Sequence, residues 1–572
     1  MIATASQSPP IPATAAILPD FPVMWDDPAD ARLAWTFDRV HWPDPMPPLV
    51  FAVAGEALAR GLTRASQAQE RPIQAIRVRH INTYRYQAIV PVAATPEELA
   101  MFGVRAAGQL RADMARLGEL WADEWLPEIL EHVAYWEGFD LAGAAPPALL
   151  RHLDVTMERI TRLWEIHFLL AAPMYAAIRQ FGALYQEIFE GQSVLDAYRL
   201  LQGFPNKTME TGQALWQLSR RVLASPAVLI AFAGQPAAAV IPTLERSPEG
   251  RTFLAELNAY LDVYGRRGDS WSLDTPAWIE DPRPVITSLK EYIAQPDRPL
   301  LDELAVAAQE REALIAAARA RLQGYPRPVL HEFEFLLKAA QIATVLSEDH
   351  NFWIDFRSMY EVRRVFIECG RRLVAAGALD QPADIFYLTL AEVRASLTRS
   401  GGRSRQRLVA ARRAEIGRFR AVAPPPVLGT PPPKQGKHDA LGRAWANFAG
   451  TTQPGAQEPG TLRGTGGSPG CVRGPAKIVR TPADAGKLRP GDILVAPATT
   501  PSWTPLFVTA AAVVTDTGGI LSHCAVVARE YRIPAVVGAP GATDLLSDGQ
   551  MVEVDGRSGL VRVIAAADPA RP

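Results

Sequence analysis

A single histidine, His523, stands in the part of the sequence that is best suited to chemistry. A β-like run leads into Gly518 and Gly519, and a double glycine permits a tight turn with positive φ. Ser522 follows at a typical N-cap position, and a helix-period segment, 524–531, comes directly after the histidine. The pattern therefore predicts a histidine in the first turn of a helix. Free backbone N–H groups and the helix dipole favour a bound phosphoryl group there.

A lone histidine at a helix start is more often a capping or surface residue, but the surrounding pattern favours a chemical role here. The stretch 515–538 resembles the phosphohistidine loop of the PEP-utilising enzyme family, in particular its phenylphosphate synthase and rifampicin phosphotransferase-like branches. This resemblance implies that His523 is transiently phosphorylated. The residues that match the family pattern at fixed spacing are Gly518, Gly519, Ser522, His523, Ala525, Val527, Ala528, Arg529, Glu530, Ile533, Pro534, Ala535, Val536, Val537 and Gly538.

Imidazole chemistry agrees with that role. A neutral imidazole is a good nucleophile near neutral pH, and a covalent intermediate divides one difficult transfer into two easier ones. We therefore take His523 as the catalytic residue. We assign phosphate binding to a small set of residues around it and to one arginine from elsewhere in the chain. These are Gly518, Gly519, Ser522, Arg529 and Arg266.

A second stretch, 261–282, carries two adjacent arginines between glycines. It resembles the family's YGHRG and W-x-EDP element, with Arg267 at the matching position and Arg266 in place of the histidine. Guanidinium groups bind phosphate through two parallel hydrogen bonds, so we expect Arg267, with Arg266 beside it, to stabilise the phosphoryl group during transfer. The alternative is that both arginines pair with nearby acids. Those acids are Asp269, Asp274, Glu280 and Asp281.

A third stretch, 347–365, contains the sequence Glu-Asp-His-Asn and resembles a segment of the phenylphosphate synthase branch. His350 is our candidate for the general base that deprotonates an acceptor hydroxyl, because imidazole titrates near neutrality. The alternative is a capping or ion-paired histidine.

The length and composition of the chain limit the number of domains and the classes of protein to which it can belong. The 572 residues are enough for two to four domains, and 48% hydrophobic and 21% charged residues are typical of a soluble globular protein. The net charge of -2 argues against nucleic-acid binding, and no apolar run is long enough to span a membrane. The three cysteines follow no metal-ligand spacing, so we expect no metal site and a cytoplasmic location.

The fold class predicted from these patterns is a multidomain α+β protein. We expect a flexible arm at 1–20 and a mainly helical acceptor-binding domain at 21–422, with helical patterns that include 146–178 and 181–200. A Pro/Gly-rich linker is expected at 423–469. Short β-like runs from 470 to 566 predict a small domain, which resembles the family's swivelling ββα phosphohistidine domain.

The resemblance also indicates which parts of the reaction lie elsewhere. No segment resembles the ATP-grasp domain that accompanies the histidine domain in the family's dikinases. We therefore expect a separate ATP-grasp subunit that binds Mg²⁺ and ATP, so that the enzyme is a hetero-oligomer. The expected function is a dikinase-type phosphotransferase that acts on a hydroxyl of a small, phenolic acceptor. The alternatives are a non-catalytic phosphohistidine carrier and a dikinase that has lost its activity.

Overall fold

The computed structural model describes residues 20–25, 27–39, 41–398, 404–430, 460–500 and 503–565. All but the last residue of the predicted arm at 1–20 lies outside the described residues. The same holds for the central part of the predicted linker, 431–459.

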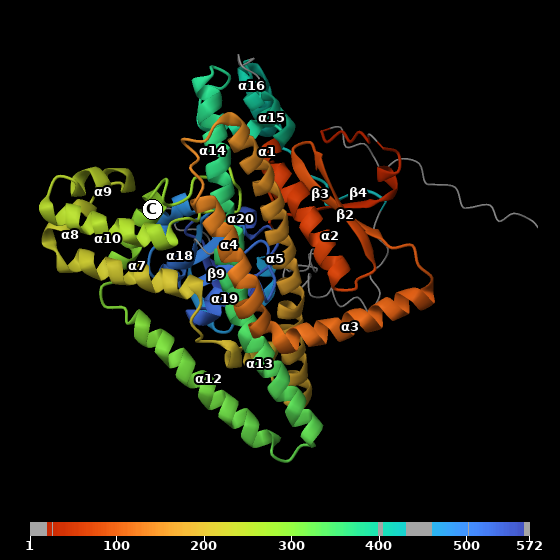
Figure 1. Cartoon of the computed structure of the whole chain (residues 1–572). Helices are drawn as coiled ribbons and strands as arrows, with labels where there is room; N and C mark the ends of the chain where they lie inside the picture. Colours follow the sequence, from red (N-terminus) through yellow and green to blue (C-terminus); the bar gives the residue numbers. More distant parts are fainter. Residues whose placement is uncertain are drawn as a thin grey trace, which may run out of the picture.

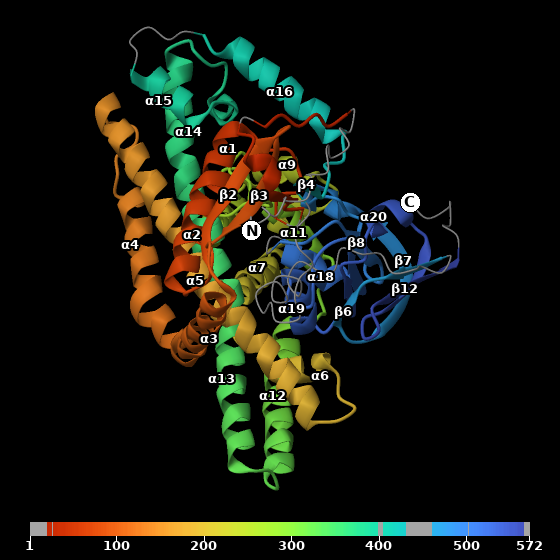
Figure 2. The same ribbon diagram turned by 90° about the vertical axis from the view of Figure 1, so that its right-hand side faces the viewer.

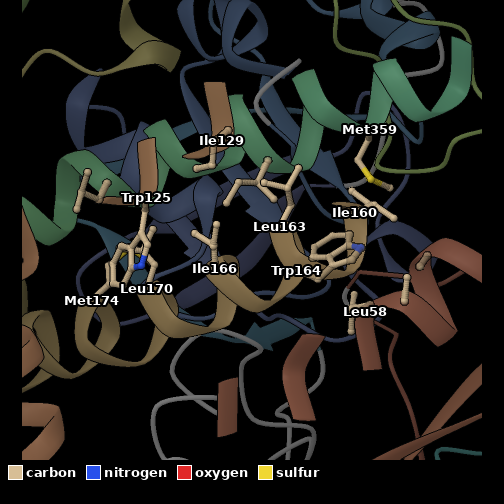
Figure 3. Packing of buried hydrophobic residues seen from close by; sticks show 14 of the residues in the cluster. Leu58, Trp125, Ile129, Ile160, Leu163, Trp164, Ile166, Leu170, Met174 and Met359 are labelled. Atoms are coloured by element: carbon tan, nitrogen blue, oxygen red, sulfur yellow. The ribbon is translucent and has the colours of Figure 1, made fainter. Parts of the chain in front are cut away.

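A body of long helices with a shared hydrophobic core forms the largest part of the chain (Figure 1). Its central element is α5, Pro146–Ile188, which packs against α13, Arg327–His350. Figure 3 shows Trp125 beside Leu170 and Met174 of α5 in this core. The other helices of the body are α1 (Pro48–Phe51), α2 (Leu58–Ala68), α3 (Pro96–Glu119), α4 (Leu126–Glu137), α6 (Val194–Tyr198), α12 (Leu300–Leu322), α14 (Met359–Ala375), α15 (Leu390–Thr398) and α16 (Gln406–Arg420).

Three π-helical segments interrupt the long helices of this body. They are η2 (Ala52–Ala57), η3 (Leu120–Trp125) and η5 (Asn351–Ser358), and η5 joins α13 to α14 without a break in the rod. A π-helix inserts extra residues into a turn and often marks a functional site.

Five shorter helices form a second group at the side of the body (Figure 1). They are α7 (Lys207–Ala224), α8 (Pro226–Phe232), α9 (Ala237–Leu244), α10 (Pro248–Tyr264) and α11 (Arg283–Ile293). Between α10 and α11 the chain forms an irregular loop, 265–282, which contains the two adjacent arginines.

A four-stranded antiparallel sheet packs beside α2 in the order β2-β3-β1-β4. Its hairpin of β2 (Ile73–Ile81) and β3 (Tyr84–Pro91) is extended by β1 (Ala34–Phe37) and β4 (Val427–Gly429). β4 lies within the predicted linker, so regular structure continues into the start of that segment.

The C-terminal domain, residues 460–565, is built on an eight-stranded sheet with the order β5-β12-β11-β7-β8-β9-β10-β6. Its inner strands β7, β8, β9 and β10 pair in parallel, and β9 leads into α19. The elements are β5 (Thr461–Arg463), β6 (Thr465–Ser468), β7 (Cys471–Ile478), β8 (Ile493–Ala496), α18 (Thr504–Thr509), β9 (Ala512–Thr515), α19 (His523–Glu530), β10 (Ala535–Val537), α20 (Ala542–Leu545), β11 (Met551–Asp555) and β12 (Leu560–Ala565).

This domain is docked against the second helix group (Figure 2). One hydrophobic cluster joins Met209 of α7 and Leu289 of α11 to Phe507 of α18 and Tyr531 after α19. The predicted α+β multidomain class is thus confirmed, with the small domain at the C-terminus. Among the described helices, none combines the length and the apolar character needed to cross a bilayer.

Candidate functional site

His523 is the first residue of α19, directly after the turn that follows β9. Gly518 in this turn has a φ of 108°, and a Cβ there would lie only 3.0 Å from Ser522 Oγ. Gly519 O accepts the Ser522 N–H at 2.9 Å. Ser522 is the N-cap residue, but its hydroxyl makes no cap bond and has no partner among the described residues. The predicted turn and helix are thus present, and a free hydroxyl lies next to the histidine in the chain.

The His523 ring contacts the helical body through Glu348, near the end of α13. His523 Nδ1 lies 3.1 Å from Glu348 Oε2, and the two side chains are only 7% and 3% exposed. Thr208 Oγ1 of α7 donates a hydrogen bond to the same carboxylate oxygen at 2.7 Å. A carboxylate beside Nδ1 favours the tautomer that carries its proton there, so the lone pair is on Nε2. Nε2 has no hydrogen-bond partner among the described residues.

The carboxylate of Glu348 is held in its charged form. Burial raises the pKa of this group, but the electrostatic interaction and hydrogen bond with His523 and the hydrogen bond from Thr208 outweigh that effect and lower the pKa. A charged acceptor at Nδ1 stabilises the positive charge that develops on the ring when Nε2 forms a bond. The pair is therefore suited to a nucleophilic imidazole.

Arg267 belongs to the same buried region. It is 2% exposed, lies 5.0 Å and 5.1 Å from the ring centres of Trp278 and Phe356, and donates from Nη1 to Thr211 Oγ1 at 3.4 Å. Thr211 is one helical turn beyond Thr208, so adjacent positions of α7 contact Arg267 and Glu348.

The guanidinium of Arg267 is incompletely satisfied. Burial lowers its pKa to about 10, which leaves the group charged at neutral pH. Its Nε and Nη2 have no hydrogen-bond partner among the described residues. A buried cation with unpaired N–H groups is costly, and an anion that accepts from both would remove the cost. Arg267 thus offers an anion-binding group in the region of the His523–Glu348 pair.

Arg266, its neighbour, has a different environment. Its guanidinium pairs with Glu137 of α4 and lies 3.5 Å from Glu361 of α14, and Arg357 pairs with the same Glu137. For Arg266 the structure shows the acid-paired alternative, although the acids differ from those considered in the sequence. Among the described residues, the guanidinium of Arg266 contacts these carboxylates and not His523.

His350 lies two residues beyond Glu348 but belongs to another cluster. Its Nδ1 donates to Leu346 O at 2.6 Å, and its ring centre is 4.8 Å from that of His167 on α5. Burial, with the nearby His167, lowers the pKa of His350 to about 4. Residues two apart on a helix do not face each other, and the structure places Glu348, not His350, against His523. The general-base role of His350 stays a prediction.

Arg529 supports the turn in the docked arrangement. Its Nη1 donates to Gly467 O at 2.7 Å and to Ile520 O at 3.0 Å, and its guanidinium lies 5.1 Å from the ring centre of Tyr198. Burial lowers its pKa to about 10. Arg529 therefore holds the segment between Gly519 and His523, while its predicted phosphate contact stays a prediction.

Two contributors were missed by sequence reasoning. Glu348 belongs to the Glu-Asp-His-Asn segment, but the catalytic role in that segment was assigned to His350. No sequence pattern indicated a role for Thr208. The position of Glu348 on the inward face of an amphipathic helix could have indicated its role. Charged residues are seldom fully buried without a partner, so a partner for this carboxylate was to be expected.

Glu530, at the end of α19, makes the docked interface sensitive to pH. Its Oε2 accepts the Gly203 N–H at 2.9 Å, and burial raises the pKa of this carboxyl to about 7, against the lowering effects of Gly203, Arg529 and Arg311. Because the folded-state pKa is the higher one, the folded chain holds the proton more tightly. Stability is therefore lost as pH rises from about 4.5 to about 7.

Replacing Glu530 by glutamine is expected to remove this penalty while keeping an acceptor for Gly203. The variant should be more stable than wild type by about 1 kcal/mol at pH 5 and about 3 kcal/mol at pH 8. Denaturant unfolding at both pH values measures the difference. Glu310→Gln is the matched control, since Glu310 forms an exposed pair with Arg532 at the same contact. A stability gain that does not change with pH would contradict the expectation.

Two family models match the two parts of the chain that form this site, the C-terminal domain and the helical region. Residues 488–559 match the family described as PEP-utilising enzyme, mobile domain, and residues 167–348 match the rifampicin phosphotransferase fourth domain. The first match contains His523, and the second contains Arg267 and Glu348. These two matches, with the relatives named below, support the PEP-utilising, rifampicin phosphotransferase-like family for the matched regions of the chain.

Three relatives show how far the similarity extends. The chain is 44% identical to chondramide synthase cmdD of Chondromyces crocatus over 96% of its own length. It is 31% identical both to the rifampicin phosphotransferase of Streptomyces sviceus, over 63% of its length, and to the prodigiosin synthesizing transferase PigC of Serratia marcescens, over 62%. The chain covers 14%, 40% and 38% of these relatives, less than half of each.

Proposed function

We propose that this chain is a phosphotransferase component that carries a phosphoryl group on Nε2 of His523 to a hydroxyl of a small, phenolic acceptor. The observation that carries the proposal is a buried imidazole that Glu348 holds through Nδ1, while Nε2 has no partner in the described part of the chain. Arg267 supports it, because two of its buried N–H groups are free to bind a phosphoryl oxygen.

The chemistry proceeds in two balanced steps. In the first, Nε2 attacks phosphorus, a P–N bond forms, and the P–O bond to the leaving group breaks. In the second, the acceptor oxygen attacks phosphorus, the P–N bond breaks, and the hydroxyl proton passes to a base. In the docked arrangement Glu348 holds the Nδ1 proton and stabilises the charged ring, as the carboxylate does in a catalytic triad.

The donor in this proposal is Mg-ATP, bound by a separate ATP-grasp subunit. Nε2 attacks the β-phosphorus and AMP leaves, and water then cleaves the β–γ P–O bond and releases phosphate, so that His523 keeps one phosphoryl group. The names of two relatives as a phosphotransferase and a transferase favour group transfer. The phenolic acceptor is favoured by the aromatic rings around the anion-binding group, since Trp278 and Phe356 flank Arg267.

Access requires the C-terminal domain to leave its docked position. The cavity beside α19, lined by Leu521, Val526 and Arg529 among others, has a volume of about 10 Å³, room for a single water. His523 is almost completely covered. We propose that the domain swivels between the ATP-grasp partner and the helical body.

The test combines the full chain with Mg-ATP and a separately produced ATP-grasp protein. We expect an acid-labile mass gain of one phosphoryl group on His523. The labelled chain, freed of nucleotide and partner, should then release an aryl phosphate when phenols are added. Omitting the ATP-grasp protein is the control for the need of a partner.

Two results would change the proposal. No label on His523 under any donor would overturn the phosphohistidine. Label that passes to a third protein but never to a small hydroxyl would favour the carrier alternative, which the small volume of the cavity beside α19 supports.

Arg267 gives a further expected result. Arg267→Lys keeps the charge but loses the planar pair of N–H donors, so the rate of transfer should fall by on the order of 10²-fold. Single-turnover transfer from labelled chain to a phenol measures this rate. Arg266→Lys is the matched control, because Arg266 is paired with Glu137, and a change below about 3-fold is expected there. Equal losses in both variants would contradict the assignment.

A further inference from the structure

A second cluster of titratable side chains has two members near Glu348 in the chain and is separate from the His523–Glu348 pair. It consists of His167 on α5, His350 at the end of α13 and Asp355 in η5. One ligand atom from each side chain lies within 4.8 Å of the others. His167 Nδ1 is 3.0 Å from Asp355 Oδ1, and the two imidazole rings are 4.8 Å apart.

The π-helix explains why His350 and Asp355 converge. They are five residues apart, and in an α-helix such a spacing separates side chains by about 140°. A π-helix has its hydrogen bonds between residues five apart, so that spacing brings the two side chains to one face. The packing of α5 on α13 then adds His167 from the opposite side.

The His350 side chain is already oriented for binding a metal ion through Nε2. Its Nδ1 is held by Leu346 O, which fixes the tautomer and leaves Nε2 with a lone pair. Metal-bound histidines commonly have the second nitrogen held in this way by a backbone carbonyl. His350 and Asp355 are 2% and 6% exposed, while the His167 side chain is 17% exposed and offers an approach from solvent.

We propose that His167, His350 and Asp355 bind one divalent transition-metal ion of the zinc class. Two imidazoles and one carboxylate suit such ions and not Mg²⁺ or Ca²⁺, which prefer oxygen ligands. Three protein ligands leave a further position open. The bound ion joins α5 to the α13–η5 rod two residues from Glu348 and so fixes the helix that carries it.

This inference revises the expectation of no metal site. His167 and His350 are far apart in the sequence, and no ligand spacing connects them. It does not depend on the phosphohistidine, since the three side chains are a separate cluster from the His523–Glu348 pair.

Cobalt titration of the full, tag-free chain after chelator treatment is the test. We expect one equivalent of Co²⁺ with visible d–d bands of nitrogen and oxygen coordination, displaced by Zn²⁺ and unaffected by Mg²⁺. A sulfur-to-cobalt charge-transfer band would instead assign the ion to a cysteine and overturn the proposal. The same holds if the wild-type chain retains no Co²⁺ at micromolar concentration.

Variants locate the ion. His167→Ala and Asp355→Asn should each weaken Co²⁺ binding by more than about 100-fold, since loss of a ligand exceeds the loss of a supporting contact. His152→Ala is the control, because His152 is a buried histidine of the same helix α5 that stacks on Phe139. Circular dichroism checks that each variant folds. If a variant does not fold, the Co²⁺ spectrum of the wild-type chain alone decides whether the metal site exists. Undiminished binding in folded ligand variants would overturn the site.

Discussion

Replacing His523 by alanine is expected to abolish both the label and the transfer. The rate of aryl phosphate formation should fall by on the order of 10⁴-fold or more, because the covalent route has no other nucleophile at this place. Mass spectrometry of the intact chain after incubation with Mg-ATP and the ATP-grasp protein measures the label. Quantifying the phenol product measures the transfer.

Cys524 provides the matched control for His523. It is the next residue of α19, and burial raises the pKa of its thiol to about 12, so that it is not a thiolate at neutral pH. Cys524→Ala should therefore label and transfer as wild type does, within about 3-fold. Persistent labelling of His523→Ala, or its loss in Cys524→Ala, would show that the imidazole is not the acceptor.

Replacing Glu348 by glutamine is expected to slow transfer of the phosphoryl group from His523 to the acceptor by about 10²- to 10⁴-fold, because Glu348 contacts His523 in the docked arrangement. The amide keeps the size of the side chain but removes the charge that holds the Nδ1 proton and orients the ring. The rate of labelling and the KM for ATP should stay the same, because phosphorylation takes place at the partner, away from Glu348. Single-turnover transfer from the labelled chain to a phenol measures the effect.

Two further variants separate this role from a structural one. Glu348→Asp retains the charge and should recover part of the lost rate. Asp349→Asn is the control at the adjacent position, where the carboxylate accepts the Lys207 N–H at 2.8 Å at the start of α7. An asparagine can accept the same bond, so a change below about 3-fold is expected. Equal rates for Glu348→Gln and wild type would remove Glu348 from the mechanism.

Local sequence patterns were sufficient for the elements that depend on near neighbours. The turn at Gly518 and the helix that begins at His523 were predicted at their observed positions, because φ preferences and capping act within a few residues. The capping box of Thr95 and Glu98 at the start of α3 likewise joins residues only three apart in the chain. The predicted boundaries of the long helices agree less well with the structure. The pattern indicated separate helices at 146–178 and 181–200, whereas α5 continues to Ile188, because packing in the core overrides local breaks.

The amino-acid pattern alone identifies the histidine that stands at a helix start beside a glycine turn, and its resemblance to the family loop. The contacts of that histidine follow from how distant parts of the chain pack together. Glu348 lies 175 residues away, and the adjacent Arg267 and Arg266 have opposite environments, one buried with free N–H groups and one ion-paired. The reason is that turns and helix starts follow from interactions between near neighbours. The meeting of α7, α13 and α19 follows from the burial of a shared core, which no local pattern records.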